Sequence, residues 1–200
     1  LGYDDGMLEY EDTKEVVADT IEGSWLGGTV RGNFEGVWED GLSFSGAIAA
    51  RALDPSLVDP GWKGQINLDV SGSARFPGNA PREISVSGKL NESTLMEHAL
   101  TGGIEAHVSG TNVDIRSLEL HGRGFDLSGR GNVSERLALS ISASDLSFLF
   151  PDAGGSISAG GWIRWRDGMV TGELSGHGTD LIWTDLKISS ADIRGRALAD

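Results

Sequence analysis

Apolar and small polar residues alternate along most of the chain, a period that places the two kinds of side chain on opposite faces of extended strands. The clearest case is the segment 66–71, in which Ile66, Leu68 and Val70 are separated by single polar residues. The same alternation recurs in the segments 84–87, 104–108, 113–115, 118–120, 125–128, 137–142, 157–159 and 170–174. Glycine or asparagine stands between these segments, as turn residues do. The pattern predicts an almost purely β chain.

Two short segments depart from this pattern. Residues 54–58 and 145–150 each begin with an aspartate that can cap a single helical turn, Asp54 and Asp145. We therefore expect two isolated helical turns within the β chain.

The alternation is one-sided, because one face of each predicted strand carries serine, threonine or charged residues and the other carries aliphatic ones. A strand buried on both faces would be apolar throughout. The polar face is therefore expected to face water. The apolar face needs a cover, which a second sheet, closure of the sheet on itself or an apolar ligand would supply.

An internal repeat is visible when the chain is compared with itself at an offset of 91 residues. Segments 54–60 and 145–151 share an aspartate, a serine, apolar residues and a closing proline, and slightly smaller offsets relate 86–88 to 174–176. Ordered matches of this kind indicate β units that stack in an array. We divide the chain into an acidic partial repeat at 1–50, a repeat unit at 51–141 and an incomplete second unit at 142–200.

Residues 145–151 with 155–161, and the tail 174–188, resemble the recurrent glycine-and-leucine unit of the TamB family, within the AsmA-like group of bacterial envelope proteins. The resemblance is best over about residues 50–200. It implies an elongated, curled, antiparallel-rich sheet (a β-taco or groove) built from repeats, with an apolar concave face. It also implies that the chain is an internal fragment of the repeat region, a central or late slice of the groove.

The resemblance also implies a location and a function. Proteins of this family are anchored in the inner membrane and cross the periplasm, so this chain would be a periplasmic part. They are implicated in phospholipid movement between the membranes and in the assembly of outer-membrane proteins. The expected partners are phospholipid acyl chains and, through parts outside this chain, a TamA-like outer-membrane barrel. Exposed edge strands also predict self-association of this fragment.

On this interpretation the aliphatic positions of the strands line the groove and dissolve acyl chains. The predicted lining residues are Ile66, Leu68, Val70, Ile84, Val86, Ile104, Val108, Val113, Ile115, Leu118, Leu120, Phe125, Leu127, Leu137, Leu139, Ile141 and Ile157.

Charge and composition narrow the function classes. The chain has 16 lysines and arginines against 30 aspartates and glutamates, a net charge of −14. This balance argues against a nucleic-acid partner, because little could neutralise a phosphate backbone. Residues 1–40 hold eleven acids and two bases, a local net charge of −9. The lack of cysteine excludes disulfides and thiolate metal sites.

Candidate chemistry is sparse. The four histidines, His98, His107, His121 and His177, lack metal-ligand spacing and are expected at surface positions of strands. The segment 124–131 has phosphate-loop glycine spacing without the lysine, and we interpret it as a hairpin turn. We therefore expect no catalytic residue, no metal site, no cofactor and no enzymatic activity.

The six tryptophans lie beside glycines or at expected strand ends. They are Trp25, Trp38, Trp62, Trp162, Trp165 and Trp183. Trp162 and Trp165 should point to opposite faces of one strand, since they are three residues apart. We expect these rings to cover glycines or to plug the ends of the groove, with an aromatic rim at a membrane interface as the alternative.

Three other classes stay open at this point. A closed β-sandwich or adhesin-like module would bury the apolar faces of two sheets against each other. A glycan-binding β-solenoid would show stacked aromatic residues and polar ladders. An enzyme would need a concave cluster of titratable groups.

Overall fold

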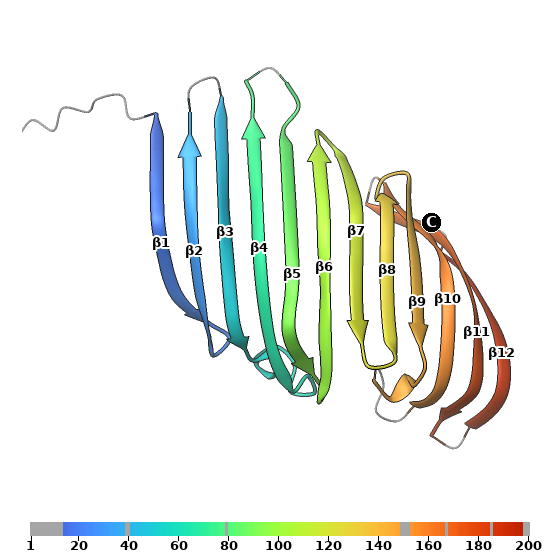
Figure 1. The fold of residues 1–200 in the computed structure, drawn as a ribbon. Coiled ribbons are helices and arrows are strands. Elements are labelled where there is room, and N and C mark those ends of the chain that lie inside the picture. Colours follow the sequence, from blue (N-terminus) through green and yellow to red (C-terminus); the bar gives the residue numbers. More distant parts are fainter. Residues whose placement is uncertain are drawn as a thin grey trace, which may run out of the picture.

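A computed structural model describes residues 14–38, 41–78, 80–148, 153–166, 168–184 and 186–197. The described strands form a single twelve-stranded antiparallel sheet in which the strand order is the sequence order, β1 to β12. Figure 1 shows one curved layer in which each strand lies beside the strand that precedes it in the chain. The predicted all-β fold with an elongated, curled, antiparallel sheet is confirmed.

The strands and the two 3-10 turns have the following bounds: β1 (Glu15–Trp25), β2 (Gly28–Val37), β3 (Leu42–Leu53), η1 (Pro55–Leu57), β4 (Gly64–Phe76), β5 (Glu83–Leu95), β6 (His98–Ser109), β7 (Asn112–Gly122), β8 (Phe125–Asn132), β9 (Arg136–Ala143), η2 (Leu146–Phe148), β10 (Ala153–Arg166), β11 (Met169–Trp183) and β12 (Leu186–Ala197).

Every alternating segment predicted from the sequence lies within a strand. The segments 113–115 and 118–120 belong to one strand, β7, and a register shift between Ile115 and Leu118 separates them. A β-bulge at this point keeps both apolar pairs on the same face although their sequence spacing is odd. The segment 124–131 is mostly strand β8, and only Gly124 of it lies in the turn before that strand, so the hairpin interpretation was too broad.

The turns define two edges of the sheet. We call the edge that holds the connections after β1, β3, β5, β7, β9 and β11 the lower edge, and the opposite one the upper edge (Figure 1). Both 3-10 turns lie at the lower edge, and both fall within the segments predicted to form short helical turns, 54–58 and 145–150. The side chain of Asp54 accepts a hydrogen bond from the Ser56 amide at 2.9 Å, and that of Asp145 accepts one from the Ser147 amide at 2.9 Å.

These capping bonds stabilise the charged carboxylates. The side chain of Ser56 and then its amide lower the pKa of Asp54 below its ordinary value, and the amide of Ser147 does the same most strongly for the pKa of Asp145. The two turns, which the sequence relates at an offset of 91 residues, therefore begin with the same cap.

The two 3-10 turns follow β3 and β9 and are thus six strands apart, and β-bulges near the lower edge recur at the same spacing. In β5 Glu92 has a φ of 35° beside a register shift, and in β11 Asp180 has a φ of 50° beside another. Such left-handed backbone is unfavourable for residues other than glycine, so its recurrence marks a built feature of the sheet. The repeated turn and bulge agree with a repeating structure, whereas the division at residues 50 and 141 stays a prediction.

A side-chain network holds the first group of bulges together. Asn67 of β4 accepts a hydrogen bond from the Ala52 amide at 2.9 Å and donates one to the Glu92 carbonyl at 3.0 Å. Ser93, only 1% exposed, accepts from the Asn67 amide at 2.8 Å and donates to the Asn91 carbonyl at 2.9 Å. The bulges free these backbone groups from the sheet ladder, and the two polar side chains satisfy them.

The hydrophobic core lies toward the lower edge. Leu100, Phe125 and Ala143 are 5%, 4% and 1% exposed and pack together, and Leu146 of η2 packs against them. No helix in the described ranges is long and apolar enough to cross a membrane.

Candidate functional site

One face of the sheet carries an unbroken row of aliphatic residues and glycines, which we call the apolar row. It contains one residue from each strand, and each is directly opposite the next in the antiparallel register. Its members are Ile21, Gly32, Ile48, Val70, Gly88, Ile104, Leu118, Gly129, Leu139, Gly161, Leu174 and Gly195. Residues that pair directly across antiparallel strands share a face. The apolar row therefore crosses the whole sheet perpendicular to the strands.

The neighbouring row, offset by one residue, lies on the opposite face and is mostly polar. We call it the polar row, and its members are Glu22, Arg31, Ala49, Asp69, Lys89, Gly103, Glu119, Ser128, Ser140, Gly160, Ser175 and Arg194. The sheet thus has one apolar and one polar face over its full extent. A curved amphipathic layer is the physical form of the one-sided alternation in the sequence.

The apolar row is open, in contrast to the core at the lower edge. Ile48 is 51% exposed, Leu174 is 43% exposed and Ile104 is 36% exposed, although each lies within a strand. Side chains from β1 to β5 also line a shallow depression, in which Phe34, Phe44 and Val86 take part and no charged residue does. Exposed apolar surface of this extent is uncommon in soluble monomeric proteins, in which such patches generally mark interaction sites.

The register brings the predicted lining residues to this one face. Val70, Ile104, Leu118 and Leu139 belong to the apolar row. The other predicted residues form rows parallel to the apolar row. Some pair directly: Ile84 with Val108 and Val108 with Val113, Leu120 with Leu127 and Leu127 with Ile141, Leu68 with Leu90, and Ile66 with Leu53. Others pair with the same intermediate residue: Val86 and Ile115 with Ala106, Ile115 and Leu137 with Gly131, and Phe125 and Ile157 with Ala143. Their role as a lipid lining stays a prediction.

The predicted lining residues differ in how far other residues of the chain cover them, and most are half-buried. Phe125 and Leu137 are buried by other residues of the chain. Val86 and Ile104 are exposed and accessible to a ligand. Phe125 and Leu137 cannot contact a bound molecule without a rearrangement of the core, whereas the exposed and the half-buried side chains, Leu139 among them, can.

Sequence reasoning did not name the part of this face that β1 to β3, β11 and β12 contribute. Phe34 and Phe44 stack with ring centroids 5.3 Å apart, and Ile48 lies between Gly32 and Val70 in the apolar row. Glycines at apolar positions hide the alternation here, as in Val30-x-Gly32-x-Phe34-x-Gly36. Counting glycine as an apolar-face residue would have revealed these strands.

Titratable groups lie mainly on the polar face and form pairs. His121 Nδ1 is 2.7 Å from Asp126 Oδ1, and His177 Nδ1 is 2.9 Å from Asp192 Oδ1. The hydrogen bond that the His121 ring forms with the Asp126 carboxylate is the largest cause that raises the pKa of His121 above its ordinary value. No group of three metal-ligating side chains occurs among the residues that the structure describes.

The tryptophans divide between the faces as expected. Trp162 lies opposite Glu173 on the polar face, and Trp165 lies opposite Val170 on the apolar one. Trp25, at the end of β1, lies opposite Gly28 in the register and is 60% exposed, and its covering of a glycine stays a prediction. An aromatic rim at a membrane is not tested by these positions.

A family model described as "TamB, N-terminal domain" matches residues 10–199. The match includes the first strands, which the sequence resemblance covered poorly. It is a match to the N-terminal domain, whereas the resemblance implied a central or late slice. No curated protein and no solved structure matches the sequence significantly.

Proposed function

Because this chain belongs to the TamB family, we propose that it is a segment of an inner-membrane-anchored, periplasm-crossing protein that carries phospholipid acyl chains between the two membranes. The same surface would serve nascent outer-membrane proteins if the cargo is an amphipathic strand. A TamA-like barrel would be contacted by parts outside this chain.

The observation that carries the proposal is the open apolar row. Its aliphatic side chains, such as Ile48 and Leu174, are exposed, and the apolar row contains no charged residue. Each methylene transferred from water to such a surface gains about 0.8 kcal/mol. An acyl chain lying on a few strands is therefore retained without recognition of its headgroup.

The row also supports movement along the sheet. Bulky residues alternate with glycines at intervals of one or two strands, as at Val70, Gly88 and Ile104. Similar sites thus succeed one another across twelve strands. A bound chain meets a series of comparable surfaces instead of one deep pocket, which favours sliding over trapping.

The alternative function, a sandwich or adhesin-like module without a groove, requires a second sheet over the apolar face. The strands in the described part of the chain all belong to one sheet. This arrangement favours the lipid-carrying proposal over that alternative.

Photo-crosslinking combined with native mass spectrometry tests the proposal. A photoreactive amino acid is placed at Val86 or Leu139 on the apolar face, with the next residues, Ser87 and Ser140, as matched controls on the polar face. Phospholipid that co-purifies and crosslinks from Val86 and Leu139, at least tenfold more than from the controls, supports the proposal. A lipid-free protein, or equal crosslinking from both faces, rejects it.

A further inference from the structure

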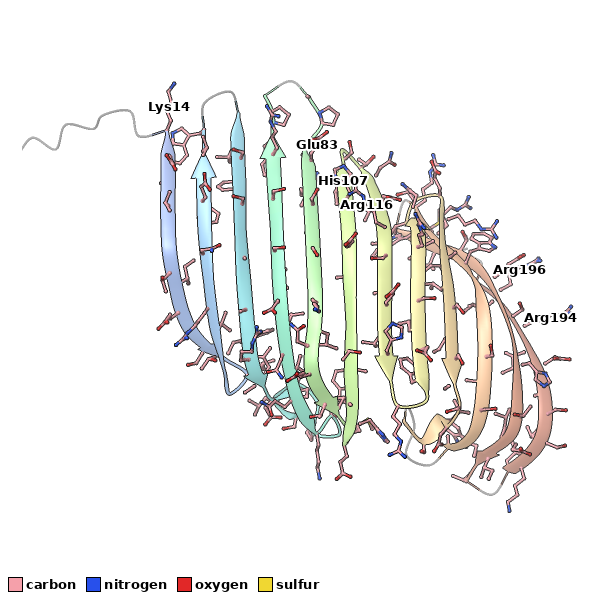
Figure 2. All side chains as sticks on the ribbon, in the orientation of Figure 1. Lys14, Glu83, His107, Arg116, Arg194 and Arg196 are labelled. Carbon is pink, nitrogen blue, oxygen red and sulfur yellow. The ribbon has the colours of Figure 1, made fainter. Side chains whose placement is uncertain are left out.

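Six arginines gather on the polar face toward the upper edge of β8 to β12. They are Arg130, Arg136, Arg164, Arg166, Arg194 and Arg196. In a chain of net charge −14 this group is a local reversal of charge. Figure 2 shows Arg194 and Arg196 projecting side by side from β12, away from the sheet.

A shallow cleft lies within this group. Its floor includes Gly160 and Ser175, which are neighbours in the polar row, and Arg194 follows them in the same row. Arg136 lines the opposite side from β9, next to Trp162. The nearest atom to a Cβ added at Gly160 would be the Leu139 carbonyl oxygen, at 3.6 Å. The floor of the cleft is therefore open space that no side chain fills at this position.

The arginine side chains of the cleft differ in the interactions that fix their positions. The Arg136 guanidinium lies 5.5 Å from the centre of the Trp162 ring, and Arg164 Nε donates to Thr171 Oγ1 at 3.2 Å. Arg196 forms an ion pair with Glu173 at 2.9 Å, which neutralises the one acid that lines the cleft. Within the described residues, Arg136 and Arg194 have no acidic partner.

We propose that this arginine cleft binds phosphate groups. Guanidinium groups present planar, paired donors that match phosphate oxygens, and stacking on an aromatic ring orients such a donor before binding. The Ser175 hydroxyl adds a neutral donor between the two walls. Because β9 and β12 are three strand spacings apart, about 14 Å, donors reach an anion from both sides of the floor.

The arginines of the cleft lie on the face opposite the apolar row, although Gly161, Leu174 and Gly195 of that row also line the cleft. The phosphate comes either from a soluble phosphate ester or from the headgroup of a lipid outside the groove. Both sources share the chemistry that the cleft recognises, and the test separates them.

The test is isothermal titration of the full chain with inorganic pyrophosphate at low ionic strength, because salt screens exposed charges. We expect saturable binding that falls at least tenfold in the double variant Arg136→Gln/Arg194→Gln. The matched control, Arg75→Gln/Arg116→Gln, removes the same charge from exposed positions of β4 and β7 and should bind as the original chain does. Circular dichroism verifies that both variants retain the sheet.

Sedimentation with vesicles distinguishes the two sources. Binding to phosphatidic acid vesicles but not to phosphatidylcholine vesicles, lost in the cleft variant, assigns the phosphate to a lipid headgroup. Pyrophosphate binding without vesicle binding assigns it to a soluble ligand, and both results support the cleft. No binding of pyrophosphate, equal loss in the control variant, or tighter binding of polyglutamate than of pyrophosphate overturns the proposal.

Discussion

The lower edge and the apolar row use the same kinds of residue on the same face, yet only the lower edge is closed. At the lower edge Leu100, Phe125 and Ala143 are buried, and Leu146 from the β9–β10 connection packs against them. Along the apolar row Ile48 and Leu174 have strand neighbours on both sides but little above them. Between these two places the difference in burial follows from the connection that packs over the lower edge, because the residues themselves are similarly hydrophobic.

The difference assigns separate tasks to the two regions. The closed region can supply stability, because its side chains leave water on folding. The open region contributes less to folding and leaves that free energy available for a ligand. One face thus combines a structural core with a binding surface.

The largest loss of stability is expected from a substitution in the closed region at the lower edge. Phe125→Ala should lower the free energy of unfolding by about 3–5 kcal/mol, because it leaves a cavity among residues that are themselves fixed. The matched substitution Ile104→Ala in the apolar row should cost about 1 kcal/mol, since much of that side chain is already in water. Urea unfolding of both variants measures the contrast. Equal losses would mean that the apolar row is covered in solution.

A smaller effect is expected from the polar network that supports the lower edge. Asn67→Ala leaves the Ala52 amide and the Glu92 carbonyl without their partners and should cost about 1–3 kcal/mol. Asn33→Ala removes one exposed hydrogen bond to the Ala47 amide of β3 and should cost about 0.5 kcal/mol. Urea unfolding compares the two, with circular dichroism of the folded proteins as the control. A harmless Asn67→Ala would show that water replaces the network.

The smallest effect concerns pH. The raised pKa of His121 means that its pairing with Asp126 stabilises the fold fully below the unfolded-state pKa of about 6.5. This contribution is lost as the pH rises through the higher pKa of the folded state. Asp126→Asn should lower the pKa of His121 in an NMR titration of the imidazole, whereas Glu35→Gln, on β2, should leave it unchanged. An unchanged pKa in Asp126→Asn would contradict the assigned cause.

Much of the fold is predictable because its local rule is simple. Alternation identified β4 to β11, and Asp54 and Asp145 marked the two 3-10 turns because an aspartate before a serine caps a helical turn. The odd spacing between Ile115 and Leu118 required a bulge that alternation alone does not specify. In β2 and β3 glycines stand at positions of the apolar face where other strands have aliphatic residues. The alternation of apolar and polar residues was therefore not visible in these strands.

The arginine cleft was not predictable from the sequence. Arg136, Trp162 and Arg194 are separated by 26 and 32 residues, and no local spacing relates them. Only the register of four successive strands brings them to one place. The pairing of His121 with Asp126 is local by contrast, because the two residues lie opposite each other across the turn between β7 and β8, and the sequence analysis considered the histidines only for metal-ligand spacing.

The strand order has a consequence for how the molecule forms. Since every strand pairs with its predecessor in the chain, the loops closed during folding are short, and the sequence separation between partners stays low throughout. A polypeptide that emerges from a narrow pore with its amino end first could therefore add one hairpin after another to the edge already formed. The order of emergence would then be the order of assembly, and no strand would have to wait for a distant partner.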